Sequence, residues 1–293
     1  MHVLDLFSGI GGFSLGLERA GMCTVAFCEC DPYCRAVLRR HWPDVPVYDD
    51  VRTLTAEALA NAERPRLRSA GYGITQEWSS SAIGQSSIDL ICGGFPCQDI
   101  SVAGKGAGIT GERSGLWSEF ARIIGDVGPR YVIIENVAAL LGRGLVRVLC
   151  DHTALGYDAE WHCIPASAVG APHRRDRIWI VAYAQARAER PGLCARKPAA
   201  QRGRRSGDSG WAHDVGEPGG SRLALGPGTL AEWAHAATTG TGWWATESGI
   251  LRVASRVPNR MDRLRALGNS LVPQIAEIIG RAIIEQEQQT QGG

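Results

Sequence analysis

The feature that most constrains the fold is a regular alternation of short apolar segments with amphipathic ones. Six apolar segments have the composition of buried strands: residues 3–7, 24–29, 45–51, 88–92, 131–135 and 177–183. Segments with helical spacing of apolar residues or helix-start signals lie between them: 13–20, 31–41, 55–62 and 116–127. Strands separated by crossover helices predict an α/β fold, an open and mostly parallel sheet with helices on both faces.

Residues of chemical interest fall at or just after the ends of these expected strands. They are Phe7, Glu29, Asp50, Pro96, Cys97 and Glu135. In open parallel sheets, ligands bind beyond the carboxyl ends of the strands. The sequence therefore predicts one ligand crevice that receives all six positions.

A glycine-rich turn follows the first expected strand. Gly9, Gly11 and Gly12 permit positive φ and a close approach of the backbone to a ligand. Glu29 comes 17 residues after Gly12, where a carboxylate meets ribose hydroxyls in this architecture, and Asp50 could accept from an adenine amino group. A tight strand–helix turn with two solvated caps is the alternative explanation.

The segment 93–101 (GGFPCQDIS) places Cys97 directly after Pro96 on a loop at the end of a buried strand. This position suits a nucleophile, whose thiolate a nearby cation would stabilise, and the arginines of residues 174–177 are candidates. Most lone cysteines are instead small buried hydrophobes. Glu135 ends its own strand at the same edge, where desolvation would raise its pKa and let it hold a proton near neutral pH.

Composition limits the class of protein. The 293 residues include 44% hydrophobic and 21% charged residues, with a net charge of +1, which fits a soluble globular chain. No apolar run is long enough for a membrane span, and residues 1–12 lack a signal-peptide pattern, so we expect a cytoplasmic protein. Nine cysteines without a secretion signal predict reduced thiols. The group Cys23, Cys28, Cys30 and Cys34 lacks the paired short spacings of a structural metal site, so no metal is expected.

The charge is unevenly distributed along the chain. Residues 1–171 carry 14 basic and 19 acidic side chains, whereas the remainder carries 17 and 11. The basic run 187–205 is either a solvated linker or a loop that faces nucleic acid. Its candidates for DNA contact are Arg202, Arg204 and Arg205.

Five motifs in order resemble those of the DNA cytosine-5 methyltransferases. They are DLFSGIGG at 5–12, GGFPCQDIS at 93–101, ENV at 135–137, RRDRIWIV at 174–181 and GNSLVP at 268–273. The resemblance implies a Rossmann-like S-adenosylmethionine-dependent methyltransferase fold plus a small irregular target-recognition domain. It implies a catalytic domain of residues 1–183 plus 256–293 and a recognition domain of residues 184–255. The last helix should start near Pro273 and fray from Glu285.

The resemblance also implies a role for each matching residue. Cys97 would attack C6 of cytosine, Glu135 would contact N3 and the exocyclic amine, and Arg175 and Arg177 match a catalytic arginine pair. Ser101 would lie near the target phosphate. The residues implied to bind S-adenosylmethionine are Phe7, Gly9, Gly11, Gly12, Glu29, Cys30, Asp50, Pro96, Leu116 and Asn269. His173 departs from the family, which has glutamine there, and the motif that precedes GNS in the family is not recognisable.

Three functions are compatible with these residues. A DNA methyltransferase that flips its target cytosine out of double-stranded DNA is favoured by the basic second half of the chain. The same scaffold could methylate RNA, such as tRNA, and a third alternative is a non-catalytic DNA-binding relative, which would not need Cys97, Glu135 and Arg175 together. We expect a monomer without a membrane partner. A restriction endonuclease that acts on the same site, without a stable complex, is the protein partner that the resemblance would allow.

Overall fold

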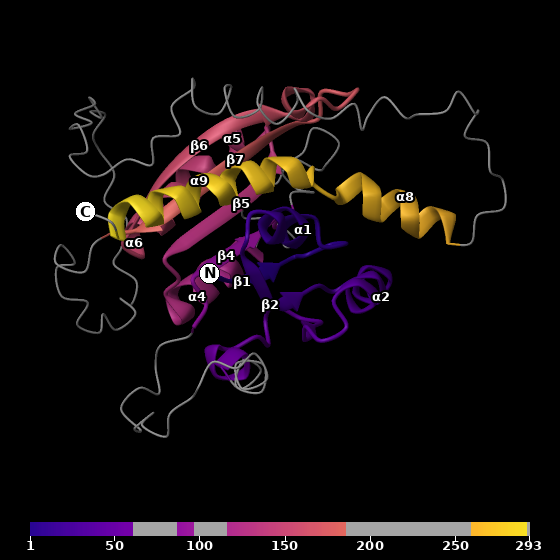
Figure 1. Cartoon of the computed structure of the whole chain (residues 1–293), viewed down its shortest axis with the longest axis horizontal. Helices are drawn as coiled ribbons and strands as arrows, with labels where there is room; N and C mark the ends of the chain where they lie inside the picture. The colour runs from indigo at the N-terminus through magenta and orange to yellow at the C-terminus, as the bar shows by residue number, and fades with distance from the viewer. Residues whose placement is uncertain (61–86, 97–115, 186–258, 292–293) are drawn as a thin grey trace, which may run out of the picture.

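A seven-stranded sheet forms the centre of the computed structural model, which describes residues 1–60, 87–96, 116–185 and 259–291 (Figure 1). The strand order is β3-β2-β1-β4-β5-β7-β6. The strands are β1 His2–Leu6, β2 Cys23–Cys28, β3 Val47–Tyr48, β4 Leu90–Gly93, β5 Tyr131–Val137, β6 Tyr157–Pro165 and β7 Asp176–Ala184. The helices are α1 Gly12–Arg19, α2 Pro32–His41, α4 Leu116–Val127, α5 Leu140–Arg143, α6 Leu145–Ala154, α8 Arg260–Asn269 and α9 Pro273–Gln291, with a 3₁₀ turn at Ala166–Val169.

The sheet is mostly parallel. β1 pairs in parallel with β2 and β4, β2 with β3, and β4 with β5. β7 runs antiparallel to both β5 and the edge strand β6. This topology confirms the α/β, Rossmann-like fold, and it brings the first residues of β7 to the edge where the parallel strands end.

Helices cover both faces of the sheet. On one face, α1 and α9 pack over alternate strand residues such as Val3, Leu90 and Ile133. On the other face, α4 and α6 pack over their neighbours in the same strands, such as Leu4 and Ile91. Consecutive strand residues point to opposite faces, so strands covered on both sides are mostly apolar on both faces, as β4 and residues 131–134 of β5 are.

The first and last helices of the described chain pack tightly against each other (Figure 1). A Cβ atom on Gly16 of α1 would collide with the carbonyl oxygen of Pro273 at the start of α9. Gly280 of α9 approaches in the same way, because its Cβ would lie 2.9 Å from that of Ala20. Glycines at these positions allow the two helix axes to come close.

Several expected elements differ from the structure. β3 comprises only Val47–Tyr48, shorter than the expected 45–51. The expected fraying from Glu285 is wrong, since α9 continues to Gln291. Its last turns are tied to the sheet because Glu287 accepts a 2.6 Å hydrogen bond from the Tyr131 hydroxyl and pairs with Arg130.

The expected recognition domain of residues 184–255 lies almost wholly outside the described residues, as does the basic run. Within the described parts of the chain, no helix has both the length and the apolar character needed to cross a bilayer.

Candidate functional site

The glycine turn between β1 and α1 has an unusual backbone shape. Phe7, Gly9 and Gly11 have φ angles of 53°, 54° and 84°, in the left-handed region. A Cβ atom on Gly11 would lie 2.6 Å from the indole ring of Trp42, and one on Gly12 would lie 3.1 Å from Leu271. Trp42 and Leu271 therefore cover the turn at Gly11 and Gly12, whereas a Cβ atom on Gly9 would meet no atom within 4 Å, so the open side of the turn is at Gly9.

Glu29 organises the turn from the end of β2. One carboxylate oxygen accepts a 2.7 Å hydrogen bond from the Gly9 amide, and the other accepts from the Asp31 amide at the same distance. Asp31 in turn caps α2, accepting from the amides of Tyr33 and Cys34, which confirms the expected helix start. The exposed residue Cys30 lies between the two acids. The Glu29 carboxylate thus joins the Gly9 turn to the Asp31 amide, and Cys30 lies beside it in the chain.

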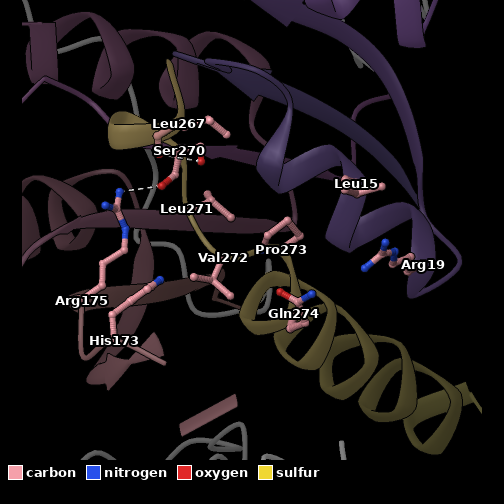
Figure 2. A pocket seen from close by; sticks show the side chains of 10 residues that line it. All are labelled: Leu15, Arg19, His173, Arg175, Leu267, Ser270, Leu271, Val272, Pro273 and Gln274. Carbon is pink, nitrogen blue, oxygen red and sulfur yellow. Dashed lines mark hydrogen bonds between the residues drawn. The ribbon is translucent and has the colours of Figure 1, made fainter. Parts of the chain in front are cut away.

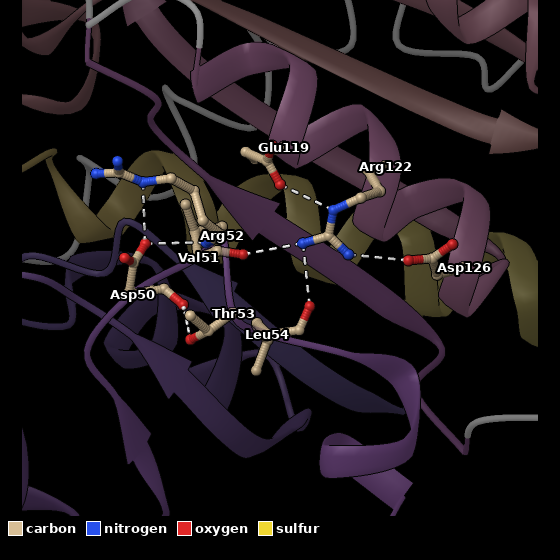
Figure 3. Close-up of polar contacts among 8 residues, drawn as sticks. All are labelled: Asp50, Val51, Arg52, Thr53, Leu54, Glu119, Arg122 and Asp126. Carbon is tan, nitrogen blue, oxygen red and sulfur yellow. Dashed lines mark hydrogen bonds and ion pairs between the residues drawn. The ribbon is translucent and has the colours of Figure 1, made fainter.

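Asp50 lies two residues after β3, on the same edge of the sheet. Its side chain is 41% exposed and pairs with Arg52 at 3.2 Å. The Asp50 carboxylate also accepts from the Arg52 amide at 2.9 Å, and the Asp50 carbonyl accepts from the Thr53 hydroxyl (Figure 3). The turn that carries Asp50 is therefore fixed by its own hydrogen bonds, with the carboxylate accessible.

The loop after β4 leads toward Cys97 and packs directly against β5. A Cβ atom on Gly94 would lie 3.1 Å from the carboxylate of Glu135. Phe95 is buried, and its carbonyl accepts a 3.1 Å hydrogen bond from the Asn136 side chain. Pro96 is the last described residue of this loop, and Cys97 and Ser101 lie outside the described residues.

Glu135 is a buried acid with one close cationic partner. The residue is 8% exposed, and its Oε1 lies 3.0 Å from Arg177 Nε. Burial raises the pKa of the carboxyl group, and the positive charges of Arg177 and Arg175 oppose that rise. Such a carboxyl can keep a proton to higher pH than an exposed one while remaining oriented by a fixed guanidinium.

Arg175 has a different set of contacts from Arg177. Its Nη2 donates to the Ser270 carbonyl at 2.5 Å, as Figure 2 shows. The same nitrogen donates to the Gly268 carbonyl at 2.9 Å. Its backbone is left-handed, with φ of 37°, and desolvation by burial lowers its pKa. The guanidinium thus fastens the start of β7 to the turn that contains the exposed Asn269, beside an open hollow of about 610 Å³.

The structure brings most of the expected positions to one edge of the sheet. Leu271, just after the GNS turn, touches the glycine turn at Gly12, so the turn of Asn269 adjoins that of Gly9. Phe7 stacks on Phe120 of α4, the helix that begins at Leu116, with ring centroids 6.1 Å apart. The positions Arg202, Arg204 and Arg205 lie outside the described residues.

Sequence reasoning missed three supporting residues. Trp42 packs on Gly11 and donates to Glu18 at 2.9 Å. Asp5 is fully buried below the glycine turn, accepts from the Ser14 hydroxyl at 2.7 Å, and has its pKa raised to about 7 by desolvation. Arg122 of α4 bonds to the turn after Asp50. The contacts of Trp42 and Arg122 span 24 and 71 residues, so no local pattern points to them. Asp5 has a local signal, because it is an acid within the apolar segment 3–7.

Potential metal ligands are not grouped in the described regions: no cluster of three or more His, Cys, Asp or Glu side chains there is arranged to hold an ion.

Comparison with known proteins identifies relatives of this chain. The family model for C-5 cytosine-specific DNA methylases matches residues 1–205. The type II methyltransferase M2.BsuMI of Bacillus subtilis is 34% identical over 190 residues, which are 62% of this chain and 42% of that protein. M.AquIA of a Picosynechococcus strain is 29% identical over 192 residues, 61% of this chain and 70% of that protein. This chain therefore aligns with less than half the length of the Bacillus protein.

The chain also superimposes in part on solved structures. A prophage-encoded protein of E. coli, described as a DNA modification methyltransferase, superimposes with a TM-score of 0.49 at 25% identity, over 63% of this chain and 47% of that one. DNMT2 of Spodoptera frugiperda gives 0.47 at 18% identity, over 68% of this chain and 55% of that one. The family model covers well over half of the chain and includes the glycine turn, the Cys97 loop, Glu135 and both arginines, so this chain belongs to the C-5 cytosine-specific DNA methylase family.

Proposed function

We propose that the chain transfers a methyl group from S-adenosylmethionine to C5 of a cytosine flipped out of a specific double-stranded DNA sequence. The observation that carries this proposal is the buried Glu135, paired with Arg177 at 3.0 Å, at the same sheet edge as the glycine turn. A binding module has no need of a desolvated acid oriented in this way beside a cysteine loop.

The residues present fit S-adenosylmethionine. A Cβ atom placed on Gly9 would meet no atom within 4 Å, so the turn has open space at Gly9, and Glu29 and Asp50 offer carboxylates for ribose hydroxyls and an adenine amino group. Phe7, Cys30, Pro96 and Leu116 would line the same site, and Asn269 would close its methionine end. When bound, S-adenosylmethionine supplies the electrophilic methyl group that C5 of the cytosine accepts.

Cytosine C5 is a poor nucleophile, so the protein must activate the ring. In the proposed reaction the Cys97 thiolate adds to C6, and Glu135 donates its proton to N3, which leaves electron density at C5. After methylation, a base removes the C5 proton, the C6–S bond breaks, and the N3 proton returns to the Glu135 carboxylate, so the ring and the Cys97 thiolate are restored. Arg177 orients Glu135 throughout and favours the carboxylate that remains after proton donation.

The reacting face of cytosine is hidden in a duplex, so the base must leave the stack. Residues 184–255 are the proposed recognition domain, inserted into the catalytic domain of residues 1–183 and 256–293. Arg202, Arg204 and Arg205 are the proposed phosphate contacts there, and Ser101 would contact the phosphate of the target nucleotide.

Expression in a host that lacks cytosine methylation, followed by bisulfite sequencing, tests the activity and reports its sequence context. We expect the wild-type chain to methylate cytosines within one short recurrent sequence, so that these cytosines resist bisulfite conversion. Expression of Cys97→Ala should leave every cytosine convertible. Unmethylated DNA from both, with purified protein that binds S-adenosylmethionine and methylates tRNA, would replace DNA by RNA as the substrate. Retained turnover in Cys97→Ala would overturn the assignment of the nucleophile.

A duplex that contains 5-fluorocytosine at the identified site tests the covalent step. Fluorine cannot leave as a proton, so the Cys97–C6 adduct should persist after methyl transfer and migrate as a denaturant-resistant complex. Cys97→Ser, which keeps a hydroxyl but no thiolate, is the matched control. An adduct in that variant, or none in the wild type, would contradict the mechanism.

A further inference from the structure

Arg122 of α4 connects four groups from two separate parts of the chain (Figure 3). Within its own helix, Nε donates to Glu119 at 2.8 Å and Nη1 donates to Asp126 at 2.9 Å. Across the gap to the turn after β3, Nη2 donates to the carbonyls of Val51 and Leu54, both at 3.0 Å. The two acids hold the guanidinium in place, so its remaining donors point at the turn.

The turn that receives these bonds carries Asp50. Val51 follows Asp50 directly, and the Asp50 carbonyl accepts from the Thr53 amide at 3.2 Å within the same turn. Val51 and Leu54 are buried, 5% and 1% exposed, so their side chains anchor the turn in the core while Arg122 holds its carbonyls. The Asp50 backbone is thereby fixed from two sides.

The same helix supports a second position of the cofactor site. Phe120, two residues before Arg122, is fully buried and stacks on Phe7 at an interplanar angle of 17°. α4 thus contacts both Phe7 and the turn of Asp50, through Phe120 and Arg122. A shift of this helix would therefore displace both Phe7 and the turn of Asp50, two of the proposed cofactor-binding positions.

We infer that Arg122 is a positioning residue for the adenine end of the cofactor site: its bonds to the Val51 and Leu54 carbonyls set the place of Asp50. This inference rests on the proposed binding of S-adenosylmethionine. It adds to that proposal a residue that does not touch the cofactor. The alternative is that Arg122 only stabilises the packing of α4.

Calorimetric binding of S-adenosylmethionine and of adenosine to the full chain, without DNA, tests the inference. Arg122→Met keeps the stem of the side chain and removes all four bonds, and we expect about tenfold weaker binding of both ligands. Arg122→Lys keeps the charge but cannot bridge two carbonyls, so we expect an intermediate effect and a folded protein. Arg281→Met is the matched control, because it makes the same change at an arginine of α9 that pairs with Glu277 and does not contact the turn of Asp50; its affinity should equal that of the wild type.

A double-mutant cycle separates positioning from general stability. Asp50→Asn should weaken binding about tenfold, and Arg122→Met should add less than a further twofold in that background, because Asp50 is the group through which Arg122 acts. Full additivity, or wild-type affinity in both Arg122 variants, would overturn the inference while leaving the proposed function intact. Failure of the wild-type chain to bind S-adenosylmethionine would overturn the proposed function itself, and the inference with it.

Discussion

Arg177 Nε lies 3.0 Å from Glu135 Oε1, and both side chains come from adjacent antiparallel strands at the edge of the sheet where the parallel strands end. Glu135 pairs with Trp179 in the strand register, and Arg177 pairs with Val137, so the two charged residues are diagonal neighbours on the sheet. The ion pair is therefore set by backbone pairing, and the orientation of the acid does not depend on a loop.

Glu135→Gln tests the proton at N3. Glutamine keeps the size of the side chain but cannot transfer a proton, so we expect kcat to fall by about 10²–10⁴-fold, with little change in the affinity for DNA. In the wild type, the raised pKa of Glu135 keeps the acid protonated to higher pH than an exposed carboxyl. We expect single-turnover rates to decline as the pH rises above that pKa. An unchanged rate in the variant, measured on the identified DNA site, would exclude Glu135 as the acid.

Arg175→Met tests whether the two arginines of the motif act separately. Arg175 donates to the carbonyls on either side of Asn269, whereas Arg177 pairs with Glu135. We expect Arg175→Met to raise KM for S-adenosylmethionine with a smaller change in kcat. We expect Arg177→Met to lower kcat with a smaller change in KM for S-adenosylmethionine. Equal effects of both variants on kcat alone would show that Arg175 acts at the cytosine instead.

Asp5→Asn tests the buried acid below the glycine turn. The carboxyl has a pKa of about 7 in the folded chain against an ordinary value of 3.8, so the folded state binds the extra proton between these pH values. The free energy of unfolding should therefore fall as the pH rises from about 4 to about 7 and then level off. Asparagine carries no charge, so the variant should lack this slope and be more stable at pH 8, by up to about 4 kcal/mol. Denaturant unfolding at a series of pH values measures this pH dependence of the free energy of unfolding. Asp44→Asn is the control, because Asp44 is exposed.

Simultaneous neutralisation of Arg202, Arg204 and Arg205 to Ala tests the basic run. If these side chains bind phosphates, DNA affinity should fall at low salt, and the slope of log K against log salt should become shallower by about 0.9 for each phosphate that is no longer neutralised. Arg39, Arg40 and Arg147, which lie on the described surface, provide a charge-matched control triple. An unchanged slope in the Arg202 triple would mean that the run does not touch the DNA backbone.

The positions of the buried strands are the part of the fold that the sequence predicts best. Apolar segments covered on both faces are recognisable without tertiary information, so five of the predicted strands coincide with β1, β2, β4, β5 and β7 to within two residues at each end. The edge strand β6 was not predicted, because one of its faces is partly exposed and Glu160, Trp161 and His162 break the apolar run. Helix α8 was not predicted either, since its exposed face carries Met261 and Leu264 among charged residues and only Ala266 is buried.

The residues of the site could be predicted one by one, but the hydrogen bonds and ion pairs between them could not. Glycines, the strand-end acids and the arginine pair are local signals that the resemblance could interpret. Arg175 contacts the GNS turn, more than 90 residues away in the sequence, whereas Arg177 contacts Glu135. The hydrogen bond from Arg122 to Val51 spans 71 residues. Such contacts follow from packing of the whole domain, which no local pattern contains.

The close packing of α1 on α9 has a consequence for how the intervening chain can vary. The last helix is held in place by its packing on the first, through Gly16 and Gly280, and by the Tyr131–Glu287 bond, so its position does not depend on the length of chain between β7 and α8. A chain with a different number of residues between 186 and 258 can therefore keep the packing of α9 on α1, and with it the place of the Asn269 turn beside the glycine turn.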